Sequence, residues 1–126
     1  MARLLVVDDD STLRELLRVH LRGAGYTVKT SADAAEAIRM ILAEKPDLIL
    51  SDIKMPYMGG LELLEALRAD PATRDIPLMV LTASDSDEDH VRARRLGVMG
   101  YLVKPVSVDE LLRAIDSGLR GARSAA

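Results

Sequence analysis

The sequence predicts an α/β fold, a doubly wound five-stranded parallel sheet with helices on both faces. Five short apolar runs alternate with stretches whose apolar residues recur every three or four positions, which is the pattern of successive βαβ units. Three of the runs are apolar at consecutive positions, as expected for strands that helices cover on both sides. The chain has 126 residues, of which 48% are hydrophobic, and this size and composition suit one domain.

The predicted strands are short and lie at intervals along the whole chain. They occupy residues 4–7, 26–30, 48–50, 78–81 and 101–103. The second run contains two threonines and a lysine, so it is expected near an edge of the sheet, where polar side chains are tolerated.

A helix is predicted after each strand. The segments with apolar residues at helical spacing are residues 13–21, 34–42, 61–67, 86–96 and 107–119. Asp33 with Glu36, and Ser107 with Glu110, have the spacing of capping boxes at the starts of the second and fifth helices. Each such cap contributes roughly 1 kcal/mol at most.

The fourth predicted helix differs from the others because Val91 and Leu96 are its strongly apolar residues. Its acidic first turn and basic last turn complement the helix dipole, but its attachment to the sheet is expected to be weak. Two interpretations stay open at this point: a solvated surface helix, or an element that moves.

Composition and charge exclude several classes of protein. Lys and Arg total 17 and Asp and Glu total 20, for a net charge of −3, and aromatic residues make up 2%, so direct binding of nucleic acid is not expected. The sequence has no cysteine, which excludes thiolate catalysis and zinc-thiolate sites. It shows no secretory signal and no apolar run long enough for membrane insertion, so we expect a cytoplasmic protein.

The expected domain covers residues 1–120, and residues 121–126 are expected to form a flexible tail or a linker stub.

Polar residues follow four of the predicted strands at their carboxyl ends, where ligands of parallel α/β sheets bind. They are Asp8, Asp9 and Asp10 after the first strand, Ser51 and Asp52 after the third, Thr82 after the fourth and Lys104 after the fifth. Carboxylates about 4 Å apart repel by about 4 kcal/mol at an effective dielectric constant of 20, so a cation is required. An all-oxygen site with two or three carboxylates suits Mg²⁺. Together with a lysine and a hydroxyl, such a site has the groups needed to receive a phosphoryl group on Asp52.

From residue 3 to about residue 119, the sequence resembles the receiver domain of response regulators in bacterial two-component signalling. The matching segments are LLVVDDD at 4–10, PDLILSD at 46–52, MP at 55–56, GG at 59–60, LTA at 81–83 and GYLVKP at 100–105. The resemblance implies a flavodoxin-like fold with strand order 2-1-3-4-5. The resemblance is to receiver domains of the single-domain type. The sequence leaves open whether the chain acts alone or belongs to a longer protein.

The resemblance also implies roles for particular residues. Asp52 corresponds to the phosphoacceptor, and the metal ligands are Asp9, Asp52 and the backbone carbonyl of Lys54, with Asp8 helping through water. Lys104 corresponds to the lysine that contacts the phosphoryl group.

The switch residues of the family also have counterparts in this sequence. Thr82 corresponds to the switch hydroxyl, and Tyr101 to the aromatic residue whose rotamer follows it. Pro105 corresponds to a proline after a cis peptide bond. The side chains of Lys54 and Ser84 lie where the family varies and where they help or block the hydrolytic water, so the lifetime of the phosphoryl group stays open.

The resemblance implies a signalling switch that catalyses its own phosphorylation and dephosphorylation and is otherwise not an enzyme. The implied partners are a sensor histidine kinase or a histidine phosphotransfer protein, followed by an unidentified protein target. That target would bind the surface of the fourth helix, fifth strand and fifth helix, and a homodimer on activation is compatible with the resemblance.

Two alternatives to the receiver fit parts of the sequence. The segment DDDST at residues 8–12 also fits the Asp-x-Asp-x-Thr opening of haloacid-dehalogenase-like phosphatases, in which Asp8 would be the nucleophile and Asp10 the acid/base. The chain is short for that fold with its cap, and no acidic pair follows Lys104 at the strand end. The other alternative, a scaffold without phosphorylation, is disfavoured because the acidic set, Lys104 and Thr82 are all present.

Overall fold

The computed structural model describes residues 2–125 as five strands and five helices in alternation. The strands are β1 (Arg3–Val7), β2 (Thr27–Ser31), β3 (Leu48–Ser51), β4 (Leu78–Thr82) and β5 (Gly100–Val103). The helices are α1 (Ser11–Gly23), α2 (Ala34–Ala43), α3 (Gly60–Ala69), α4 (Asp87–Arg95) and α5 (Val108–Ala125). Every predicted strand and helix is present, with bounds that differ by up to six residues, the largest difference being at the end of the fifth helix.

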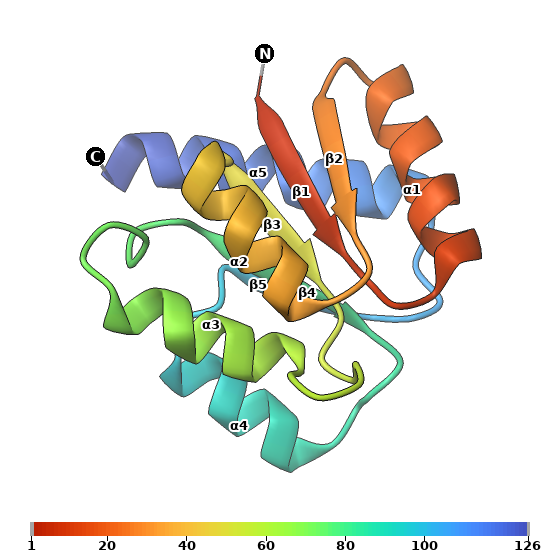
Figure 1. The fold of residues 1–126 in the computed structure, drawn as a ribbon. Helices are drawn as coiled ribbons and strands as arrows, with labels where there is room; N and C mark the ends of the chain where they lie inside the picture. The colour runs from red at the N-terminus through yellow and green to blue at the C-terminus, as the bar shows by residue number, and fades with distance from the viewer. Residues whose placement is uncertain (1, 126) are drawn as a thin grey trace.

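The strands form one parallel sheet in the order β2-β1-β3-β4-β5, which confirms the predicted topology. The helices cover both faces: α1 and α5 lie on one side, and α2, α3 and α4 on the other (Figure 1). The polar second strand is an edge strand, as its composition predicts.

Two hydrophobic cores lie on opposite faces of the sheet. In β1, Leu5 and Val7 belong to the core beneath α2 and α3, whereas Leu4 and Val6 belong to the core beneath α1 and α5. Because successive side chains of a strand point to opposite faces, a strand buried on both sides must be apolar at every position. This explains the consecutive apolar runs in the sequence.

Helix starts follow the predicted capping signals. The Asp33 carboxylate accepts a hydrogen bond from the Glu36 amide at 2.8 Å, and the Ser107 hydroxyl accepts one from the Glu110 amide at 3.1 Å. At the end of the chain, α5 continues to Ala125, past the expected domain boundary at residue 120. The interpretation of residues 121–126 as a tail or linker stub stays a prediction.

The fourth helix is attached weakly, as predicted, but the residue that it buries is not one of its strongly apolar ones. Ala93 is the residue that α4 buries, whereas Val91 is 44% exposed. On its polar side, Arg92 forms ion pairs with Glu62 at 2.6 Å and with Glu65 at 3.8 Å, both on α3. Because exposed ion pairs contribute little free energy, the attachment of α4 depends on a few contacts: buried Ala93, the ring of His90 stacked on Tyr101, and weak charge pairs.

No helix within residues 2–125 is long and apolar enough to cross a membrane.

Candidate functional site

The predicted site residues meet at the carboxyl edge of the sheet. The pairing of Val7 with Ser51 in adjacent strands places the next residues, Asp8 and Asp52, side by side. On the other side, the Lys104 amide donates to the carbonyl of Thr82 at 2.8 Å. The sheet register therefore brings together residues that lie as much as 96 positions apart in sequence.

Three carboxylates form an acidic cluster at this edge. Asp8, Asp9 and Asp52 each present an oxygen, and these oxygens lie within 4.8 Å of one another. Asp8 is 3% exposed, the side chain of Asp52 is 12% exposed, and Asp9 faces solvent. Burial raises the pKa of Asp8 above its ordinary value, although the amide of Asp10 and the ammonium of Lys104 act against that shift.

Lys104 lies between the two buried carboxylates. Its Nζ is 3.2 Å from Asp8 Oδ2 and 3.2 Å from Asp52 Oδ2. Burial alone would lower the pKa of Lys104, but the charges of the two aspartates outweigh burial and raise it. The Lys104–Pro105 peptide bond is cis, as the sequence analysis expected.

The composition of this cluster fits a divalent cation. When ionised, the three carboxylates exceed the Lys104 ammonium by two negative charges, and all three acidic side chains offer oxygen, the donor that hard cations prefer. The exposure of Asp9 leaves one side of the cluster open to water, which Mg²⁺ retains in its coordination shell. The acidic cluster can therefore hold a metal ion.

The backbone around Asp52 is held tightly against α3. Asp52 Oδ1 accepts hydrogen bonds from the amides of Ile53 at 2.6 Å and Lys54 at 3.3 Å, so its other oxygen is the one that faces Lys104. A Cβ atom at Gly60 would overlap the carbonyl oxygen of Asp52. The glycine allows the start of α3 to approach the acidic residue this closely.

Thr82 and Tyr101 are linked through Ser84. The Thr82 hydroxyl, in a residue that is 1% exposed, accepts from the Ser84 amide at 3.2 Å, and the Tyr101 hydroxyl donates to the Ser84 carbonyl at 2.9 Å. The ring of His90 on α4 stacks on Tyr101 with centroids 3.8 Å apart. Contacts therefore connect Thr82 through Ser84 to Tyr101 on β5, and through Tyr101 to His90 on α4.

The domain model of the response regulator receiver domain matches residues 4–116 of this chain. The chain belongs to this family. Among curated proteins, the receiver is 42% identical over 118 residues to the response regulator MprA of Mycobacterium ulcerans and to that of Mycobacterium avium, covering 94% of this chain. It spans about half the length of these relatives, at 50% and 51%.

Solved structures agree with the family assignment. A CheY-like receiver domain protein from Methanospirillum hungatei aligns with a TM-score of 0.94 and 32% identity, covering 100% of this chain and 99% of that one. The chemotaxis protein CheY4 of Vibrio cholerae aligns with a TM-score of 0.87 and 35% identity, covering 93% and 98%. The flavodoxin-like receiver fold is thus confirmed, and the phosphatase alternative receives no support.

The geometry of this receiver assembles Asp8, Asp9, Asp52 and Lys104 in direct contact or close proximity. Thr82 is part of the neighbouring network with Tyr101. The role of each residue, including the metal-binding role of the Lys54 carbonyl, stays a prediction.

Sequence reasoning missed two residues at the rim of the site. The Arg14 guanidinium donates to the backbone carbonyl of Asp8 at 2.8 Å; its position in the first turn of α1, four residues after Asp10, is the available signal. Asp89 accepts a hydrogen bond from the Ser84 hydroxyl. Its place in the acidic first turn of α4 suits the helix dipole equally well, so the sequence does not distinguish this contact.

Proposed function

We propose that this receiver domain accepts a phosphoryl group on Asp52 from a phosphohistidine of a sensor kinase or a histidine phosphotransfer protein. The observation that carries the proposal is the position of Asp52 Oδ2, which lies 3.2 Å from Lys104 Nζ inside a cluster of carboxylates suited to a cation. A carboxylate in that setting has a nucleophilic oxygen and a positive group ready for a phosphoryl oxygen.

The transfer exchanges one bond to phosphorus for another. An oxygen of Asp52 attacks phosphorus, the bond from phosphorus to the histidine nitrogen breaks, and an acyl phosphate forms on Asp52. The Lys104 ammonium, now held by Asp8 and Asp52, binds an oxygen of the incoming group. The attacking and leaving atoms must lie in line, so the donor approaches from the open side of the acidic cluster.

Magnesium is the proposed cofactor because every candidate ligand is an oxygen. Asp9 and Asp52 and the backbone carbonyl of Lys54 would hold the ion, and Asp8 would help through water. When bound, Mg²⁺ neutralises negative charge on the phosphoryl oxygens and on the carboxylates around them.

Phosphorylation is proposed to switch the surface formed by α4, β5 and α5. The Thr82 hydroxyl would leave the Ser84 amide to bond a phosphoryl oxygen, and Tyr101 would then change rotamer. Because α4 is attached weakly, a modest difference in binding free energy between the two conformers is enough to shift their populations.

Apart from catalysing its own phosphorylation and dephosphorylation, the domain is proposed to have no enzymatic activity. The protein target, a homodimer on activation and the cytoplasmic location stay predictions.

The direct test is to incubate the protein with acetyl phosphate and Mg²⁺, reduce the adduct with borohydride, and sequence the labelled peptide. We expect a mass gain of one phosphoryl group and a label at Asp52. A label at Asp8 would support the phosphatase-type chemistry instead, and no gain in mass would contradict both.

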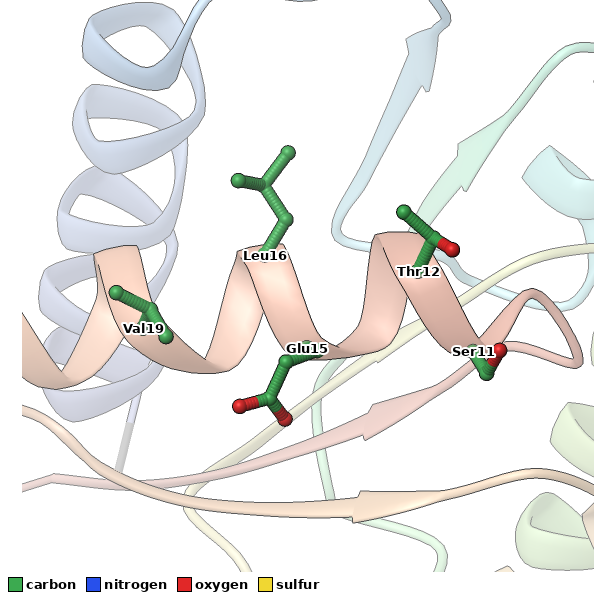
Figure 2. A pocket seen from close by; sticks show the side chains of 5 residues that line it. All are labelled: Ser11, Thr12, Glu15, Leu16 and Val19. Carbon is green, nitrogen blue, oxygen red and sulfur yellow. The ribbon is translucent and has the colours of Figure 1, made fainter.

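The outer face of α1 is the surface that we propose for the histidine donor. Leu16 and Val19 are 52% and 55% exposed, and with Ser11, Thr12 and Glu15 they line a shallow hollow of about 540 Å³. Thr12 and Leu16 project to the same side of the helix (Figure 2). Because α1 begins two residues after Asp9, a protein bound there lies next to the acidic cluster, as in-line transfer to Asp52 requires.

The variant Leu16→Glu is expected to reduce the rate of transfer from a phosphorylated histidine protein by about tenfold, since losing one apolar contact and placing a charge there costs on the order of 1–2 kcal/mol. The rate with acetyl phosphate should not change, because that small donor needs no docking surface. Both rates are measured by the appearance of phosphorylated receiver with time. Equal losses with the two donors would show damage to the site and not to docking.

A further inference from the structure

Asp89, in the first turn of α4, joins two loops that border the phosphoacceptor. Its Oδ2 accepts a hydrogen bond from the Ser84 hydroxyl and lies 3.7 Å from Lys54 Nζ. The side chain of Asp89 is 16% exposed, while that of Lys54 is 73% exposed. Asp89 is separate from the cluster of three carboxylates at the edge of the sheet.

Both partners of Asp89 are bonded to residues of the site through their backbones. The Lys54 amide donates to Asp52 Oδ1 at 3.3 Å. The Ser84 amide donates to the Thr82 hydroxyl at 3.2 Å. The two residues whose side chains contact Asp89 are therefore bonded through their backbone amides to the Asp52 carboxylate, in the case of Lys54, and to the Thr82 hydroxyl, in the case of Ser84.

Phosphorylation changes what attracts the Lys54 ammonium. In the unmodified protein Asp89 is ionised at neutral pH, and its Oδ2 is the carboxylate oxygen 3.7 Å from the Lys54 ammonium. A phosphoryl group adds about two negative charges at neutral pH. Because the Lys54 side chain is long and exposed, its ammonium can then turn either to Asp89 or to the phosphoryl group.

We propose that Asp89 is a positioning residue that sets the lifetime of the phosphoryl group on Asp52, by holding the Lys54 ammonium and the Ser84 hydroxyl away from it. This inference rests on the proposed function. In hydrolysis, water attacks phosphorus, the bond between phosphorus and the Asp52 oxygen breaks, and inorganic phosphate and a proton leave with the carboxylate restored.

The effect on hydrolysis follows from the path of the water. Water must approach phosphorus in line with the leaving Asp52 oxygen, from the side that Lys54 and Ser84 border. A lysine released from Asp89 is drawn to the phosphoryl oxygens and excludes water from that approach. Removing the charge of Asp89 therefore slows hydrolysis, and it does so only while Lys54 is present.

The test compares the decay of the phosphorylated protein in matched variants. Each is loaded with acetyl phosphate and Mg²⁺, freed of donor by rapid desalting, and followed by intact mass. Asp89→Asn keeps an oxygen that accepts from Ser84 but loses the charge that holds Lys54. We expect its half-life to lengthen by about two- to threefold, the size that one surface ion pair supports.

A double-mutant cycle separates positioning from a general structural effect. The double variant Lys54→Gln/Asp89→Asn should decay at the rate of Lys54→Gln alone, and Asp89→Glu should restore the rate of the unmodified chain. Asp87→Asn removes a charge from the same helix turn and should leave the rate unchanged, which controls for the helix dipole.

Three results would overturn the inference. They are an unchanged half-life in Asp89→Asn, an equal effect of that substitution with and without Lys54, and an equal effect of Asp87→Asn. In each case normal loading of Asp52 would leave the proposed function intact. Failure of the unmodified chain to load would overturn the proposed function, and this inference with it.

Discussion

Asp52→Asn is expected to lose all phosphorylation by acetyl phosphate in the presence of Mg²⁺, measured as the gain in intact mass. The amide keeps the shape of the side chain and an oxygen that accepts from the Ile53 and Lys54 amides, so the fold should be retained. It removes the anionic oxygen that faces Lys104, and a neutral amide is not a nucleophile toward phosphorus.

The matched control is Asp8→Asn, the same change in the adjacent buried carboxylate. In our proposal Asp8 assists through water and through Lys104, so this variant should still be labelled at Asp52, more slowly. Labelling that survives Asp52→Asn and disappears in Asp8→Asn would contradict the assignment of Asp52. Circular dichroism of both variants establishes that they are folded.

Removing divalent metal is expected to have the second largest effect. With excess EDTA the rate of phosphorylation should fall by more than a hundredfold, because several kcal/mol of charge stabilisation by the ion are lost. Adding Mg²⁺ back should restore the rate and raise the melting temperature of the unphosphorylated domain, since a ligand that binds the native state stabilises it.

Asp9→Asn should raise the Mg²⁺ concentration needed for half-maximal stabilisation by more than tenfold, because it removes one charged ligand from the proposed site. Asp109→Asn, an equal change of charge at an exposed position on α5, should leave the Mg²⁺ dependence as it is. Equal Mg²⁺ dependence in Asp9→Asn and the unmodified chain would remove Asp9 from the ligands.

The strands and the acidic edge could be predicted because their signals are local and strong. Strands buried on both faces require consecutive apolar residues, and the positions where these runs stop, at Asp8, Asp52, Thr82 and Lys104, fix which side chains reach the edge. The strand order came from the family resemblance, since periodicity does not specify which strands are neighbours.

The contacts of α4 could not be predicted from periodicity. Val91 is strongly apolar and yet faces solvent, whereas the smaller Ala93 is buried, because packing depends on the rotation of the helix and not on hydrophobicity alone. The contact between Lys54 and Asp89 joins a loop to the first turn of α4, and such pairs have no sequence period. The acidic first turn of α4 also complements the helix dipole, so the sequence gives no separate signal for a second role of Asp89.

The two-faced packing of β1 and β3 restricts where this chain can gain or lose residues. Deleting Leu5, for example, would turn Val6 toward the layer that now receives Leu5, and would shift the following aspartates by one position and to the other face. Insertions in the turns at the opposite, amino-terminal edge of the sheet would disturb neither the packing of the strands on their two faces nor the positions of the aspartates. Length variation in this domain should therefore be tolerated at that edge, far from the chemistry, and penalised within the strands.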